Sequence, residues 1–240
     1  MQVESTNTSA AANGRSAAIK ISTQAEVDSQ QAEQAAAQDR SNLYTSLGAL
    51  LVGPATKEHC AVLRALPEIE SPESPMEIAW TMLRQSAASY SAEQIDDEYH
   101  HLFIGLGRGE IVPYGSWHIT GFLMEKPLGQ LRADLRKLGF ERNDGVAESE
   151  DHIASLCQAM SAIILAEEID FETERAFFNH HIAPWAEDFF KLVQDSSSAG
   201  FYRAVGFLGE SFLSVEKQYC LLYTSPSPRD ATLSRMPSSA

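Results

Sequence analysis

The sequence has no long apolar run and few cysteines. No stretch of about 18 consecutive apolar residues occurs, and the N-terminus lacks the apolar region of a secretory signal, so we expect neither a signal peptide nor insertion into a membrane. The three cysteines, Cys60, Cys157 and Cys220, are odd in number and form no Cys-x-x-Cys motif. This usage is typical of a reducing compartment, and we expect a soluble, cytoplasmic protein.

Basic residues are also scarce. The 240 residues include 18 lysines and arginines against 33 aspartates and glutamates, which gives a formal net charge of −15. This excess of negative charge argues against nucleic acid as a partner and favours a cationic partner. Apolar residues still make up 44% of the chain, so a sizeable core is available. The length suits one large domain or two small ones.

Large apolar residues are rare at both ends of the chain. Residues 1–38 are rich in Ala, Ser and Gln, and we expect a disordered or loosely helical extension, in which residues 24–38 could form a polar helix continuous with the first apolar helix. Eight of the last sixteen residues are Ser or Pro. We therefore expect residues 223–240 to be a disordered, non-native tail, and we leave them out of the predicted fold.

Residues 39–222 show the apolar spacing of helices throughout. Leu43, Leu47, Leu50 and Leu51 recur at helical intervals, and later segments repeat the pattern between helix-start and helix-stop signals. These segments run over about 56–66, 76–90, 126–138, 149–164, 171–181, 184–194 and 199–219. No alternating strand pattern of any length competes with them. The sequence therefore predicts an all-α fold, a single multi-helix bundle with short connections.

The stretch from Ile95 to Gly121 interrupts this regular pattern. It begins as a helix with Leu102 and Phe103 on its inner face and then breaks at three glycines between 105 and 109. An extended Pro-Tyr-x-Ser segment comes next, at 113–116. An aromatic loop held between helices is typical of a recognition surface, because loops on a rigid scaffold often carry function.

Several motifs in this order resemble one known family. The pattern Glu-Tyr-x-x-Leu-Phe-x-Gly-x-Gly at 98–107 is followed by Pro-Tyr-x-Ser at 113–116, by Glu-Ser-Glu-Asp-His-Ile at 148–153 and by Phe-Phe-x-x-His-Ile-x-x-Trp at 177–185. Together with Phe-Tyr-Arg at 201–203, these motifs are similar to those of the TorD/DmsD family of cytoplasmic chaperones. The resemblance implies a TorD-like all-helical domain over 39–222.

The resemblance also implies a function. Members of this family bind the twin-arginine signal peptide, or the apo form, of a molybdenum-cofactor oxidoreductase, assist cofactor insertion and hold back export until maturation. We therefore expect a non-enzymatic chaperone without a cofactor of its own. Its expected partners are a twin-arginine leader peptide and an apo-molybdoenzyme catalytic subunit, with no nucleic acid. The family pattern leaves a monomer and a domain-swapped homodimer open.

Candidate binding residues come from these motifs. Asp151 and His152 are the first pair, because a carboxylate can meet an arginine guanidinium in bidentate geometry and because the resemblance implicates this box in signal-peptide binding. The alternative is that Ser149 caps the next helix while Glu150 and Asp151 complement its dipole. The remaining candidates for client binding are Tyr114, Ser116, Trp117, Glu98, Tyr99 and Phe103, with Trp117 expected in the extended loop as an aromatic contact for an apolar segment.

Two other classes of function stay open. Glu98 and His101 have the Glu-x-x-His spacing that di-iron helical bundles use twice, but no second copy occurs in the chain. We therefore expect no metal site, and a metal-dependent helical-bundle enzyme is one alternative that metal analysis would detect. The other alternative is a generic acidic helical adaptor, which would show no preference for twin-arginine peptides.

Overall fold

The computed structural model of the chain describes residues 9–105, 109–141 and 148–222. In these ranges the chain forms the helices α1 (Ser9–Leu51), α2 (Lys57–Arg64), α3 (Pro75–Ser89), α4 (Ala92–Tyr99), the π-helical turn η1 (His100–Ile104), α5 (Gly115–Thr120), α6 (Lys126–Lys137), α7 (Ile153–Leu165), α8 (Phe171–His181), α9 (Ala186–Asp195) and α10 (Phe201–Leu222). Extended pairing within the same ranges is limited to one isolated bridge, between Tyr114 and His152. The prediction of an all-α fold is confirmed.

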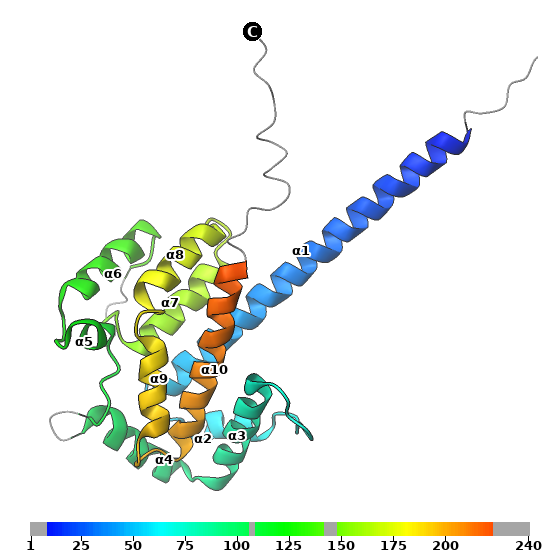
Figure 1. Ribbon diagram of the computed structural model, residues 1–240. Coiled ribbons are helices and arrows are strands. Elements are labelled where there is room, and N and C mark those ends of the chain that lie inside the picture. The colour runs from blue at the N-terminus through cyan, green and yellow to red at the C-terminus, as the bar shows by residue number, and fades with distance from the viewer. Residues whose placement is uncertain (1–8, 106–108, 142–147, 223–240) are drawn as a thin grey trace, which may run out of the picture.

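The core lies around helices α1, α7 and α10. Helix α7 packs along the C-terminal part of α1, while α10 packs against α9 and α3. Figure 1 shows the N-terminal part of α1 projecting away from this bundle, and α5 and α6 lying together on one side of it. Buried side chains of α1 and α10, including Tyr44, Leu47, Leu208 and Phe212, join these layers. None of the helices in the described ranges combines the length and the apolar character needed to cross a bilayer.

Local capping explains several helix boundaries. Ser91 starts α4 in a capping box, since its hydroxyl accepts from the Gln94 amide while the Gln94 side chain accepts from the Ser91 amide. Helix α6 ends before Gly139, whose φ of +82° is readily adopted only by glycine. Both ends match the sequence prediction. The start of α7 differs, because His152 is the N-cap and Ser149 lies in the preceding turn.

Helix α1 extends beyond the apolar spacing toward the N-terminus, into the segment expected to be disordered or loosely helical. Apolar spacing places the onset of order near Asp39, whereas the helix is continuous from Ser9. Side chains from Val27 to Ala35 are exposed, and from Val27 onward the first buried residue is Arg40. Helix-favouring Ala and Gln residues account for a helix without an apolar stripe. Packing into the core thus begins at Arg40, which keeps a domain boundary at about residue 39 as a prediction.

Limited proteolysis tests this boundary. Because the side chains of residues 27–35 are exposed, we expect cleavage there and beyond residue 222 to leave a fragment of about residues 40–220 that keeps its helicity. Mass spectrometry of the fragment and circular dichroism before and after digestion provide the measurement. Loss of helical signal in the trimmed core would show that the boundary is misplaced.

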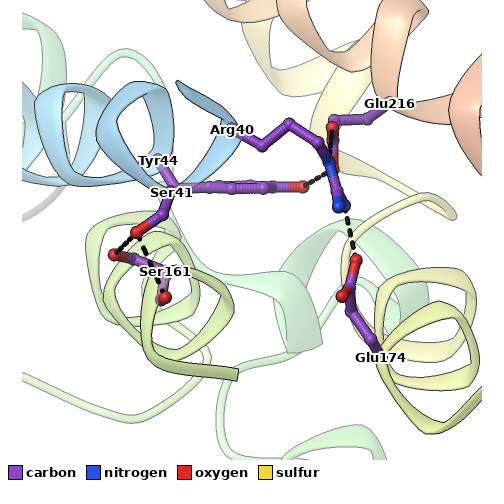
Figure 2. Close-up of polar contacts among 6 residues, drawn as sticks. All are labelled: Arg40, Ser41, Tyr44, Ser161, Glu174 and Glu216. Atoms are coloured by element: carbon purple, nitrogen blue, oxygen red, sulfur yellow. Dashed lines mark hydrogen bonds and ion pairs between the residues drawn. The ribbon is translucent and has the colours of Figure 1, made fainter. Parts of the chain in front are cut away.

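A buried ion cluster ties α1 to two other helices (Figure 2). The Arg40 guanidinium donates from Nε and Nη2 to both Glu216 oxygens, at 2.6 and 2.8 Å, and from Nη2 to Glu174 Oε1 at 2.5 Å. The Tyr44 hydroxyl donates to Glu216 Oε2 at 3.1 Å. Burial alone would lower the pKa of Arg40, but the two carboxylates raise it above its ordinary value. The cluster therefore fixes α1 against α8 and α10 through charged groups removed from water.

Candidate functional site

Two motif segments that are far apart in sequence lie side by side. The Gly115 amide donates to the Asp151 carbonyl at 2.9 Å, and the Ile153 amide donates to the Pro113 carbonyl at 2.9 Å. These bonds surround the antiparallel bridge between Tyr114 and His152. The Pro-Tyr-x-Ser segment and the Asp-His box therefore form one site, at the N-terminal ends of α5 and α7.

Asp151 holds the two segments together from a buried position, and we call its bonds to Ser116 and Ser149 the clamp. The residue is 4% exposed, and its Oδ2 accepts from the Ser116 amide at 2.9 Å. Its Oδ1 accepts from the Ser149 hydroxyl. The carboxylate thus satisfies an amide at the start of α5, where the backbone N–H groups lack helical partners. A carboxylate offers about four lone pairs, so these two bonds leave acceptor capacity on the same oxygens.

His152 caps α7. Its Nδ1 accepts from the Ala154 amide at 3.1 Å, which requires that nitrogen to be unprotonated. The side chain is buried, and burial lowers the pKa of His152 below its ordinary value despite the nearby Glu148 and Asp151. The ring is therefore neutral near pH 7 and packs edge-on against Tyr114, with 5.1 Å between the centroids.

Tyr114 faces the acidic side of the site. Its hydroxyl donates to Glu148 Oε2, and its ring is half-buried. Burial and this carboxylate both raise the pKa of Tyr114, so the phenol keeps its proton at any physiological pH. Glu148 is consequently held near Asp151, and the site presents two carboxylates together.

Gly115 permits close packing under the site. A Cβ at this position would lie 2.9 Å from Trp185 Nε1, too close for any other residue. Trp185 is held in place because its Nε1 donates to the His181 carbonyl at 2.8 Å, and His118 stacks on its ring at 5.1 Å. His118 Nε2 in turn donates to the Val112 carbonyl at 2.7 Å. These contacts fix the path of the backbone from Val112 to His118.

Trp117 differs from its expected setting. The sequence predicts an extended loop at this position, but Trp117 lies on the short helix α5 and is half-buried. The chain turns helical directly after Tyr114 because Asp151 supplies a partner for the Ser116 amide. Trp117 is still part of the same segment as Tyr114 and Ser116.

Glu98 lies apart from this site and organises the start of α10. Its carboxylate accepts from the amides of Gly200, Phe201 and Tyr202 at 2.8, 2.9 and 2.7 Å. Gly200 is needed there, because a Cβ would lie 2.4 Å from the Tyr90 hydroxyl. Glu98 therefore stabilises a helix N-terminus, where negative charge is favourable.

Tyr99 and Phe103 lie in the core behind the site. Tyr99 is 5% exposed and donates from its hydroxyl to the Leu51 carbonyl at 3.1 Å. Burial and the charge of Glu148 raise its pKa to about 12. Phe103 packs against Phe189, which also contacts His118. Glu98, Tyr99 and Phe103 thus have structural functions, and a direct role in client binding stays a prediction.

Two cavities adjoin the clamped segment. One, of about 170 Å³, runs between α5, α6 and α8 and is lined mainly by apolar side chains such as Ile119, Leu131 and Trp185. The other, of about 260 Å³, lies on the acidic side and includes Glu148 and Arg132 in its lining. Asp151 and Ser116 line both. Asp151 therefore lies between a mainly apolar cavity and a cavity that is lined by carboxylates.

Glu98 and His101 have the Glu-x-x-His spacing of di-iron helical bundles. Within residues 9–105, 109–141 and 148–222, no three or more His, Cys, Asp or Glu side chains gather in a way that could hold a metal ion. Glu98 uses its oxygens on the α10 amides instead.

Comparisons with known proteins point to one family. Residues 70–191 match the family described as nitrate reductase delta subunit. The chaperone protein TorD of Vibrio atlanticus (strain LGP32) is 26% identical over 137 residues, which cover 52% of this chain and 64% of that protein. The chaperone protein TorD of Aliivibrio fischeri (strain ATCC 700601 / ES114) is 24% identical with the same coverage. The chain therefore spans less than two thirds of the length of these relatives.

A solved structure from Archaeoglobus fulgidus, named "Putative Redox Enzyme Maturation Protein", aligns with a TM-score of 0.49 at 20% identity and covers 73% of this chain and 93% of its own. The names of the TorD relatives agree with the expectation of a non-enzymatic protein. The family match covers half of the chain and includes both segments of the site. This protein belongs to the nitrate reductase delta subunit family, which includes the TorD chaperones.

Proposed function

We propose that this chain is a cytoplasmic chaperone for a molybdenum-cofactor oxidoreductase. It binds the twin-arginine leader of that enzyme, its apo form, or both, assists cofactor insertion and holds back export until the enzyme is mature. The observation that carries the proposal is the coincidence of family match and geometry, since residues 70–191 contain both segments of the clamped site.

The chemistry of the site supports a cationic and partly apolar client. Glu148 and Asp151 line the cavity of about 260 Å³, which we call the acidic cavity. The cavity of about 170 Å³ between α5, α6 and α8 is mostly apolar. A twin-arginine leader peptide has a pair of arginines, which suits the acidic cavity, and an apolar segment, which suits the apolar cavity. We propose Tyr114, Ser116, Trp117, Asp151 and His152 as the binding face, with Asp151 able to accept from an arginine through its remaining lone pairs.

Charge gives the chain a second way to favour this client. The net charge of −15 attracts a cationic leader over a distance and speeds the encounter, while apolar burial holds the complex. The masking of a leader requires binding before export, and the proposal therefore includes a cytoplasmic location.

Calorimetry with two synthetic peptides tests the proposal. We expect a twin-arginine leader peptide to bind more tightly than its twin-lysine variant, because lysine lacks the planar fork that meets a carboxylate at two points. Association should also slow as salt is raised, since surface charges are screened beyond about 8–10 Å near physiological ionic strength. Equal affinities for the two peptides would remove the arginine-specific part of the proposal and favour a generic acidic adaptor.

A further inference from the structure

The connection from α5 to α6 exposes a group of large apolar side chains. Ile119, Phe122, Leu123 and Met124 are 45%, 67%, 50% and 79% exposed, and we call these four residues the apolar tip. Single exposed apolar residues are ordinary on a protein surface, but a contiguous group often marks a site of interaction.

The backbone of the tip has an unfavourable conformation at one residue, Met124. Gly121 has φ +80°, and Met124, with φ +59°, is the non-glycine residue with positive φ in the described part of the chain. A side chain in this region costs free energy and persists only where the surroundings impose it, which is common at functional sites. A glycine at position 124 would avoid the cost, so stability alone does not explain a methionine there.

Hydrogen bonds to Ser116 and Thr120 hold this conformation. The Met124 amide donates to Ser116 Oγ at 3.2 Å, and the Ser116 carbonyl accepts from the Thr120 hydroxyl at 2.8 Å. The Phe122 amide donates to Thr120 Oγ1 at 3.2 Å. Since the Ser116 amide donates to Asp151, the tip is connected to the Asp-His box through Ser116.

The tip borders the acidic cavity. Leu123 and Met124 line that cavity together with Glu148, Asp151 and Arg132. Arg132 is paired with Glu150, with 2.8 Å between Nη2 and Oε2. Since Glu150 balances the Arg132 guanidinium, Glu148 and Asp151 leave the charged lining of this cavity with an excess of negative charge.

We propose that the apolar tip binds the apolar segment of the client leader, with the preceding arginines in the acidic cavity. This inference rests on the proposed function and assigns its apolar contact to four residues outside the family motifs. The neighbouring charge favours this occupant over a second copy of the chain, because an uncharged or acidic surface would cover the carboxylates without a cation to balance them. The flexible thioether of Met124 also suits apolar segments of varying sequence.

Three designed peptides and three variants test the inference. The first peptide carries an Arg-Arg pair before an apolar segment, the second replaces the apolar segment by Ser and Gly, and the third replaces Arg-Arg by Lys-Lys. The tip variants are Phe122→Ser and Met124→Gly. Val62→Ser on α2 is the matched control, because Val62 is 66% exposed on a different element.

We expect Phe122→Ser and Met124→Gly each to weaken binding of the first peptide by about tenfold, as the burial of a large apolar side chain is lost. Binding of the second peptide should be weak and equal in wild type and variants. Met124→Gly should keep or raise the melting temperature, because glycine accepts the positive φ and the backbone amide at position 124 still donates to Ser116 Oγ. Val62→Ser should leave all affinities unchanged.

The outcomes separate the inference from the proposed function. If wild type prefers the first peptide to the third but the tip variants bind it normally, the inference is overturned and the proposed function stands. If wild type binds the first and third peptides equally and the tip variants lose affinity for both, the arginine preference fails while the apolar tip is supported. If wild type binds none of the peptides, both are overturned.

Discussion

Replacing Arg40 by methionine should lower the free energy of unfolding by about 3–5 kcal/mol, the usual cost of removing one partner from a buried ion pair. Methionine keeps most of the length of the side chain but leaves Glu216, which is 0% exposed, and Glu174, which is 7% exposed, without a cation. Tyr44 supplies a single hydrogen bond to Glu216 and cannot balance its charge. Chemical denaturation followed by circular dichroism measures the change.

Arg175→Met is the matched control for that experiment. Arg175 lies on the same helix as Glu174 and pairs with the exposed Glu172. An exposed pair three residues apart on a helix contributes only about 0.2–0.5 kcal/mol, so this variant should be close to wild type. An unfolding free energy for Arg40→Met that matches the control would show that the cluster contributes little to the docking of α1.

Removal of the Asp151 side chain should produce the second large effect. In Asp151→Ala the Ser116 amide loses a charged acceptor, and we expect a loss of about 1.5–3 kcal/mol of stability, the range for hydrogen bonds to charged groups. Glu150→Gln is the control, because the Glu150 carboxylate, next to Asp151 in the chain, pairs with Arg132 at the surface. Such surface pairs contribute about 0–1 kcal/mol. Thermal melts of the two variants provide the comparison, and equal melting temperatures would contradict the clamp.

Asp151→Asn separates the clamp from direct contact with the client. Asparagine can keep its carbonyl oxygen toward the Ser116 amide and turn its amide group toward the Ser149 hydroxyl, so much of the stability lost in Asp151→Ala should return. If Asp151 also meets a leader arginine, affinity for a twin-arginine peptide should remain reduced in Asp151→Asn, by about 1.5–3 kcal/mol. An affinity that recovers together with stability would restrict Asp151 to a structural role.

Features encoded in local sequence could be predicted. The apolar stripe of Leu47, Leu50 and Leu51 is buried as expected. Ser91 and Gly139 mark helix ends because a cap hydroxyl and a positive φ depend on a few neighbouring residues. The juxtaposition of the Pro-Tyr-x-Ser segment and the Asp-His box is not predicted, since nothing in the spacing of the two motifs requires it.

Features that depend on distant partners could not be predicted. Arg40 occupies the same face of α1 as Tyr44 and Leu47, but its acceptors lie 134 and 176 residues further along the chain. A polar residue on an apolar stripe was the available signal. In the same way, the Ser149 hydroxyl binds the Asp151 carboxylate instead of capping α7. That choice depends on Ser116, which is 35 residues from Asp151.

Hydrogen exchange with and without a twin-arginine peptide tests the central claim most directly, namely that the face around the clamp binds the client. The amides of Ser116, Met124 and Ile153 report on the clamp, the apolar tip and the paired segments. We predict that the peptide slows exchange at 113–124 and 148–154, while exchange on α2 and α3, at a distance from the two cavities, is unchanged. Protection confined to other helices, or no protection at saturating peptide, would contradict the account.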